Sequence, residues 1–173
     1  FENLIFLDDD DELLTSNYLD VFSKNIMQKN DDRILYTCES VLYNKGRPYR
    51  VRKPKFVGDE PQVPLLMGKT SLMMGSFVIN KRFMLSFGGF DERLERFQDA
   101  QLMLRILDHG GIVRPVRGAQ VRINYDRDQL RLNYEKYKEA KNVFLSELVE
   151  KNDNLDDRQK KHILDYHEFD LFV

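Results

Sequence analysis

An apolar run at the start of the sequence meets a block of acids. Leu4 to Leu7 are four consecutive apolar residues, and four aspartates, Asp8 to Asp11, follow them directly. A short continuous apolar run predicts a buried strand of a parallel sheet. Ligands in open α/β sheets bind at the carboxyl ends of the strands, so the acids are expected to lie at a binding site.

Further along, helical and strand-like patterns alternate. Residues 17–30 carry apolar side chains at helical spacing behind a capping residue, either Thr15 or Ser16. A second helix is predicted to end at the glycine pair Gly110 and Gly111. Strands are predicted over residues 33–43, 76–80, 112–116 and 119–125. This alternation predicts an α/β fold.

Residues 45–69 are the longest stretch without periodicity. They are rich in proline, glycine and basic residues, which is typical of a long surface loop that faces a ligand. Its basic side chains are suited to contact a phosphate, a lipid-linked acceptor or an anionic membrane, and a solvated loop is the alternative interpretation. These side chains are Arg47, Arg50, Arg52, Lys53 and Lys55.

The last part of the chain is predicted to be helical. Charged residues there alternate with apolar residues at helical spacing, first over residues 129–151 and then over residues 157–172. We therefore divide the chain into residues 1–125, which carry the α/β pattern, and a helical extension, residues 126–173.

Composition and charge narrow the function. The chain has 173 residues, 42% of them hydrophobic, which predicts one folded domain with a sizeable core. A net charge of -2 argues against nucleic-acid binding, which needs a broad basic surface. The single cysteine, Cys38, cannot form an internal disulfide, and the apolar runs are too short to span a bilayer. A cytoplasmic location is expected, and peripheral contact with the inner face of the membrane stays open.

The aspartate block needs a physical explanation, because adjacent carboxylates repel each other. Asp8, Asp10 and Asp11 at the end of a strand are suited to bind a hard cation such as Mg²⁺ or Mn²⁺, together with the phosphates of a substrate. The alternative is a solvated acidic turn whose charges favour the positive end of the following helix.

Two other acid-based sites are excluded by the residues that follow. Phosphatases of the haloacid dehalogenase type require Thr or Val two positions after the second Asp of DxD, and Glu12 stands there. An EF-hand loop requires Gly at its sixth position, where counting from Asp8 gives Leu13.

Several motifs together resemble the second half of the family 2 glycosyltransferases, which have the GT-A fold. That family has a strand ending in LDxDD, a later GGFDE segment, and a helix that opens with Glu-Asp and continues through LxxR. The corresponding segments here are Leu7–Asp11, Gly88–Glu92, Gln98–Asp99 and Leu102–Arg105. The resemblance covers about residues 3–125. It implies an incomplete GT-A mixed sheet, Rossmann-like and flanked by helices, followed by the helical extension.

The resemblance also implies roles for individual residues. Asp8 and Asp10 correspond to the DxD pair that binds the diphosphate of a nucleotide-sugar donor, and Asp10 or Asp11 is nearest the divalent ion, Mn²⁺ or Mg²⁺. Asp99 corresponds to the general base of an inverting transferase. The acceptor, a glycan or a lipid-linked sugar, is expected near three further residues, Asp91, Glu92 and Gln98. Arg105 is expected to anchor structure, and the parent activity belongs to surface polysaccharide biosynthesis.

The sequence also departs from the family pattern. Gln98 replaces the usual Glu, and no QxxRW motif follows the helix, which argues against a processive synthase. Asn124, Asp126 and Asp128 follow the last strand, where some family members supply a ligand to the metal or the diphosphate. The first hundred or so residues of the family have no counterpart, so we expect an inactive fragment whose exposed sheet edge promotes self-association. The alternative is a non-catalytic GT-A-like interaction scaffold.

Overall fold

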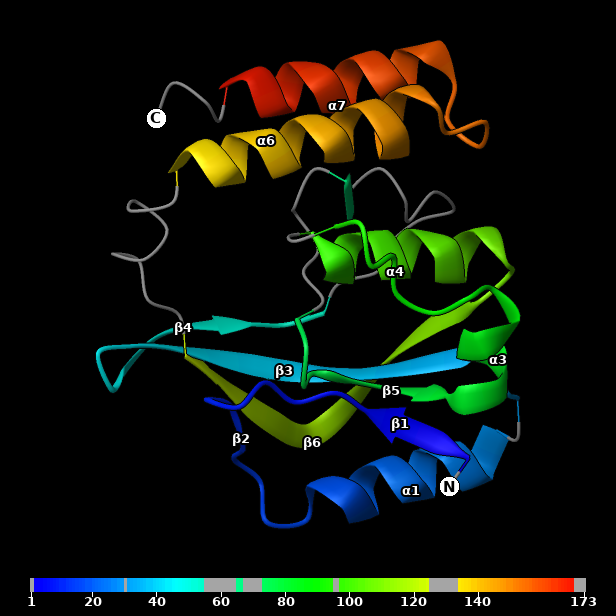
Figure 1. The fold of residues 1–173 in the computed structure, drawn as a ribbon. Coiled ribbons are helices and arrows are strands. Elements are labelled where there is room, and N and C mark those ends of the chain that lie inside the picture. The colour runs from blue at the N-terminus through cyan, green and yellow to red at the C-terminus, as the bar shows by residue number, and fades with distance from the viewer. Residues whose placement is uncertain are drawn as a thin grey trace.

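The computed structural model describes residues 2–29, 31–54, 65–66, 73–94, 97–124 and 134–169. Figure 1 shows a central sheet with helices on both sides. The strands are β1 (Asn3–Ile5), β2 (Glu12–Leu13), β3 (Ile34–Asn44), β4 (Arg47–Arg52), β5 (Phe77–Asn80) and β6 (Ile112–Asn124). The helices are α1 (Tyr18–Lys29), α3 (Lys81–Ser86), α4 (Gln98–Asp108), α6 (Tyr134–Phe144), the π-helical segment η1 (Leu145–Glu150) and α7 (Asp157–Phe169).

The sheet is mixed. Its strand order is β1-β5-β3-β6-β2, and β4 pairs with β3 off this path. β3 and β6 run parallel, whereas every other pair is antiparallel. Helix α1 covers one face of the sheet, α4 covers the other, and α6 and α7 form a further layer beyond α4 (Figure 1). The predicted α/β class, a mixed sheet flanked by helices, is confirmed.

Successive residues of β3 supply the two cores of this layered arrangement. Leu35 is buried in the core beneath α4, together with Leu102. The next residue, Tyr36, points to the opposite face and is buried with Tyr18 and Phe22 of α1. Side chains alternate across a strand, so a continuous apolar run can fill both cores at once.

The end of α4 follows the predicted chemistry, whereas the hydroxyl of Thr15, one of the two predicted caps of α1, binds the N–H of Gln120 instead. α1 covers nearly all of the predicted range of 17–30. α4 ends before the glycine pair, where Gly110 has a positive φ of 74° and Gly111 donates its N–H to the carbonyl of Ile106 at 2.7 Å. A Cβ atom on Gly111 would lie 2.6 Å from that carbonyl oxygen, so only glycine fits this close approach.

Two strand predictions were wrong in their geometry. The apolar run at Leu4–Leu7 does not form a buried parallel strand, because β1 ends at Ile5, pairs antiparallel with β5 and is only partly buried. The segments predicted as two strands around Gly118 form one strand, β6, with a left-handed φ of 87° at that glycine. The glycine therefore marks a bend within the strand and not its end.

The predicted loop at residues 45–69 begins with regular structure. Lys45 and Gly46, both with positive φ, form a tight hairpin turn, and β4 follows as an antiparallel partner of β3. Residues 55–64 and 67–69 of this predicted loop lie outside the described part of the chain.

The C-terminal helices pack on the α/β part. Phe144, Val149 and Ile163 are buried in the same core as Leu102 of α4. Asn154 also donates a hydrogen bond to the carboxylate of Asp108 at 2.9 Å. The division of the chain at residues 125 and 126 stays a prediction. No helix in the described part of the chain has both the length and the apolar character needed to cross a bilayer.

Candidate functional site

The acidic turn is held against the last third of β6 by three interactions. The carboxylate of Asp11 accepts the backbone N–H of Asn124 at 2.8 Å. Glu12 forms an ion pair with Arg122 at 3.3 Å. Thr15 accepts the backbone N–H of Gln120 through its hydroxyl oxygen at 2.9 Å. The partners in β6 are alternate residues, Gln120, Arg122 and Asn124. These interactions determine the orientation of the acidic turn on β6.

Asn124 makes a further contact that closes the turn. Its side-chain amide donates to the backbone carbonyl of Asp10, and its side-chain oxygen accepts from Arg122 at 3.2 Å. Asn124 is one of the three polar residues considered at the end of the last predicted strand, and the structure places it against the acidic turn. The other two, Asp126 and Asp128, lie outside the described residues.

Two carboxyl groups of the acidic turn, those of Asp8 and Asp11, have raised pKa values. Desolvation, followed by the charges of Asp10 and Asp9, raises the pKa of Asp8. Desolvation also raises the pKa of Asp11 to about 6, with smaller contributions from Asp10 and Asp8, although the Asn124 N–H opposes the shift. Burial and the neighbouring negative charges therefore both disfavour the ionised forms of Asp8 and Asp11.

Asp99 lies in the first turn of α4 and is largely withdrawn from water. One of its oxygens accepts the backbone N–H of Met74 at 3.2 Å. Burial, and then the negative charge of Asp8, raises the pKa of Asp99 to about 6. The Asp99 carboxylate therefore lies within range of the charge of Asp8.

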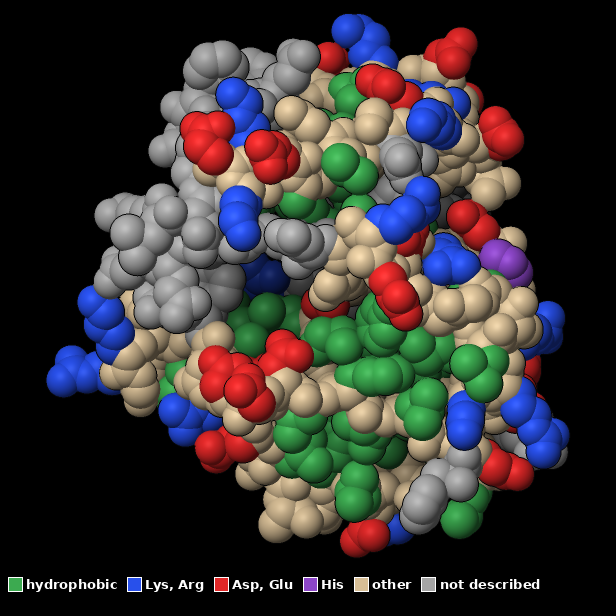
Figure 2. Space-filling view, in the orientation of Figure 1, with side chains coloured by type: hydrophobic (Ala, Val, Ile, Leu, Met, Phe, Trp, Pro, Cys, Tyr) green, Lys and Arg blue, Asp and Glu red, His purple; other side chains and the backbone are tan. Residues whose placement is uncertain are grey.

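The surface view agrees with this arrangement. Figure 2 shows acidic side chains gathered over the segment between β1 and β2, beside a recess below the C-terminal helices. The N-terminus of α4 also points toward this side of the sheet (Figure 1). A helix N-terminus favours a negative charge, so this end of α4 suits the ionised form of Asp99.

The described residues do not form a complete metal cage, because no group of three His, Cys, Asp or Glu side chains among them is arranged to hold a metal ion. Mg²⁺ and Mn²⁺ are often held by one or two carboxylates, with substrate phosphates and water completing the shell. Burial is the larger cause of the raised pKa values of Asp8 and Asp11, and repulsion between the aspartates adds to it; a bound cation would offset that repulsion. Asp10 is exposed in the same turn.

The residues predicted to contact the acceptor are mostly engaged within their own segment. Asp91 forms an ion pair with Arg93 at 2.6 Å, and hydrogen bonds from Arg93 lower the pKa of Asp91 to about 2. The side-chain amide of Gln98 donates to the carbonyl of Leu94 at 2.7 Å. Glu92 is exposed.

The glycine-rich turn before these residues is fastened to α4 and β1. Arg105 of α4 donates one guanidinium hydrogen bond to the carbonyl of Gly89 at 2.8 Å and another to the carbonyl of Phe87. The ring of Phe90 contacts Phe6 edge to face, with ring centroids 5.1 Å apart. The prediction that Arg105 anchors structure is therefore confirmed, and the turn lies directly beside the strand that leads to Asp8.

Comparisons with solved structures find proteins of similar fold. A solved structure, "Crystal structure of GalNAc-T7 with UDP, GalNAc and Mn2+", is similar to this chain with a TM-score of 0.49 and 20% sequence identity. The likeness covers 72% of this chain but only 28% of that protein's chain. No family model and no curated protein matches the sequence. At this level of similarity, the chemistry has to be argued from the residues of this chain.

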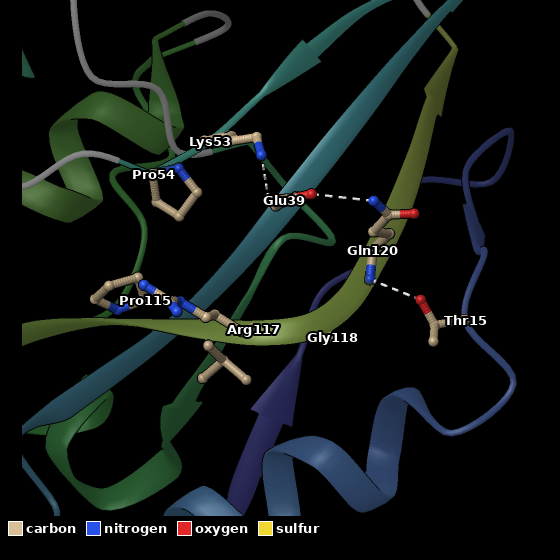
Figure 3. A pocket seen from close by; sticks show the side chains of 9 residues that line it. Thr15, Glu39, Lys53, Pro54, Pro115, Arg117, Gly118 and Gln120 are labelled. Carbon is tan, nitrogen blue, oxygen red and sulfur yellow. Dashed lines mark hydrogen bonds and ion pairs between the residues drawn. The ribbon is translucent and has the colours of Figure 1, made fainter.

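Sequence reasoning missed a cavity of about 660 Å³ that lies between Glu39 of β3, the bend of β6 and Lys53, which follows β4. Figure 3 shows Glu39 of β3 between Lys53 and Gln120. The Glu39 carboxylate pairs with Lys53 at 3.1 Å and accepts from the Gln120 amide at 3.0 Å. The Gln120 amide and Lys53 lower the pKa of Glu39, so this acid is ionised at neutral pH.

The bend in β6 shapes this cavity. Gly118 lines it, and the pairing of β3 with β6 shifts register between Thr37 and Glu39. In the sequence, Gly118 lies between two predicted strands, because a glycine often ends a strand. The sequence therefore gives no indication of a bend within one strand. Glu39 lies in β3, Gln120 lies in β6 and Lys53 follows β4, so no local sequence pattern connects these three residues.

Proposed function

We propose that this chain carries the metal- and acceptor-binding half of a family 2-like glycosyltransferase domain. One observation supports this more than any other: Asp99 in the first turn of α4 accepts the N–H of Met74, and the next residue, Gly75, packs against Leu7, directly before Asp8. A crowded acidic turn and a separate, largely buried carboxylate across a shared site suit a transferase that binds a diphosphate and activates a hydroxyl.

Asp8, Asp10 and Asp11 are assigned to the donor side of the proposed reaction. Asp8 and Asp10 would orient a nucleotide-diphosphate sugar, and Asp10 and Asp11 would hold Mn²⁺ or Mg²⁺. When bound, the cation would offset the negative charge that develops on the diphosphate leaving group. The hydrogen bonds from Asn124 keep the turn in one conformation, so its carboxylates would be oriented before the donor arrives.

Asp99 is assigned the role of general base. A base is most effective when its pKa lies near the operating pH, and the value of about 6 for Asp99 meets this condition. Asp99 would take the proton from the acceptor hydroxyl as that oxygen forms its bond to the anomeric carbon. The bond from that carbon to the diphosphate oxygen breaks in the same step, so the configuration of the sugar is inverted.

The acceptor is proposed to be a glycan or a lipid-linked sugar. Asp91, Glu92 and Gln98 are assigned to its side of the site, because the 88–92 turn packs beside Phe6 just before the acids. The cavity at Glu39, Lys53 and Gln120 offers further room for hydroxyl groups, since its ionised carboxylate and its amide both form hydrogen bonds.

Hydrolysis of the donor tests this proposal in the complete gene product. The wild type, Asp99→Asn and a control, Asp165→Asn on the exposed side of α7, are incubated with UDP-, GDP- and dTDP-sugars and Mn²⁺. We expect the wild type and the control to hydrolyse one donor, and Asp99→Asn to lose roughly 100-fold or more of that rate. If no donor is hydrolysed, the scaffold interpretation replaces the transferase.

A further inference from the structure

Phe97, directly before α4, has a backbone conformation that its residue type disfavours. Its φ of 64° and ψ of 17° are left-handed, which is rare for a bulky residue. Lys45 is the only other non-glycine residue with positive φ in the described part of the chain, and it lies in a hairpin turn beside Gly46. Phe97 also occupies the helix cap without a side-chain hydrogen bond, where Ser, Thr, Asp or Asn is usual.

Helix α6 supplies the contacts that compensate for this strain. Tyr137, Lys141 and Phe144 follow the i, i+4, i+7 spacing and therefore share one face of α6. The Phe97 ring stacks on Phe144, with centroids 4.9 Å apart, and is tilted against Tyr137 at 5.5 Å. Phe144 and Lys141 are 2% and 1% exposed, so this face of α6 is deeply buried.

The conformation of Phe97 determines where α4 begins. Its carbonyl accepts the N–H of Gln101 at 2.9 Å, which is the first hydrogen bond of the helix. Asp99 lies within that first turn and accepts the N–H of Met74. A rotation of the backbone at Phe97 would therefore move the Asp99 carboxylate relative to Met74 and to the acidic turn.

We infer that Phe97 is a positioning residue. Packing of α6 against its ring fixes the backbone at the start of α4, and this fixes the position of Asp99 in the site. The inference rests on the proposed function only in the role it gives to Asp99. Strained residues persist where the surrounding structure determines their conformation, and they cluster at functional sites. Phe97 fits that pattern, because it is an unusual capping residue in a left-handed conformation two positions before Asp99, the candidate base. The helical extension thereby gains a function in the site, although none of its residues is assigned to contact substrate.

The amide proton of Met74 reports on this positioning without requiring activity. Phe97→Ala and Phe144→Ala each remove one side of the aromatic contact, and Phe97→Tyr retains it. We expect the ¹H resonance of the Met74 amide to move upfield in both alanine variants, because its hydrogen bond to Asp99 lengthens. Phe97→Tyr should keep the wild-type resonance. Phe144→Leu, which keeps the core filled, tests the same contact if an alanine variant does not fold.

Ile163→Ala is the matched control, because Ile163 is 0% exposed in the same core but lies on α7. It should lower stability and leave the Met74 resonance in place. If the folded Phe97 and Phe144 variants leave that resonance unchanged as well, the contact serves stability alone and the inference is overturned. In an active complete gene product, kcat should fall by up to about 100-fold in Phe97→Ala while the KM for donor stays constant. Failure of the wild type to turn over a donor would count against the proposed function only, because the Met74 resonance is read independently.

Discussion

Asp99 lies within range of the charge of Asp8 although the two residues are far apart in the sequence. The charge of Asp8 contributes to the raised pKa of Asp99, and burial is the larger cause. Asp8 follows β1 at the end of the described sheet, whereas Asp99 belongs to the first turn of α4. The fold thus brings Asp99 of α4 near the acidic turn that follows β1, and the candidate site depends on this proximity.

Replacing Asp99 with asparagine should make the protein more stable at alkaline pH. The folded-state pKa of Asp99, about 6, lies above its usual value of 3.8, so the proton binds more tightly in the folded state. This contribution favours folding below pH 4 and is lost as the pH rises through 6. The asparagine oxygen can still accept the Met74 N–H but carries no charge.

Urea denaturation at pH 4 and pH 8 measures this effect. At pH 8, Asp99→Asn should exceed the wild type by about 2 to 3 kcal/mol in free energy of unfolding, and the two should converge near pH 4. An identical difference at both pH values would contradict the assigned environment of Asp99. Asp165→Asn, an exposed change, should alter stability little at either pH.

Asp91 should show the opposite pH dependence. Hydrogen bonds from Arg93 lower its pKa to about 2, so the ionised form is favoured in the folded state. Its contribution to stability is present above pH 4 and is lost as the pH falls through 2. Asp91→Asn should therefore be less stable than the wild type at pH 7, with a difference that shrinks under acid. Acid-induced unfolding followed by circular dichroism measures this, and a difference that grows as the pH falls would be inconsistent with the ion pair.

Much of the architecture could be predicted because hydrophobic periodicity is a local property. β3, β5 and α1 lie close to their predicted ranges and α4 ends where it was predicted to end, since each buries a continuous run or one helical face. The direction of β1 could not be predicted, because pairing with β5 depends on a distant segment. The bend at Gly118 was misread for a related reason, since a glycine that ends a strand and a glycine that bends one look alike in sequence.

The candidate site was predictable only in part. The order of the motifs assigns Asp8 and Asp99 to one site, and this assignment stays a prediction. The hydrogen bonds that orient Asp99 and Asp11 come from the backbone N–H groups of Met74 and Asn124. Every residue except proline has a backbone N–H group, so the sequence gives no sign of these hydrogen bonds. The strain at Phe97 was equally hidden, because a positive φ at phenylalanine is set by packing against α6 and not by local preference.

Arg105 should prove important for stability through its two carbonyl partners. Arg105→Lys keeps the charge but cannot reach the carbonyls of both Phe87 and Gly89 with one ammonium group. We expect a loss of about 1 to 3 kcal/mol in free energy of unfolding, because a partly buried carbonyl is left without its donor. Thermal or urea denaturation measures the loss. Arg158→Lys on the exposed surface of α7 is the matched control and should change little, and equal effects of the two changes would refute the anchoring role.

The most direct test of the shared site is a Mn²⁺ titration followed by NMR, because a bound paramagnetic ion broadens the resonances of nearby nuclei. The amides of Asp8 to Asp11 and Asn124 should broaden first, and Met74, which binds Asp99, should follow. The double variant Asp10→Asn with Asp11→Asn should lose this broadening. Broadening confined to the acids of α7, or broadening of the turn that leaves Met74 unaffected at saturation, would contradict a single site that contains both Asp8 and Asp99.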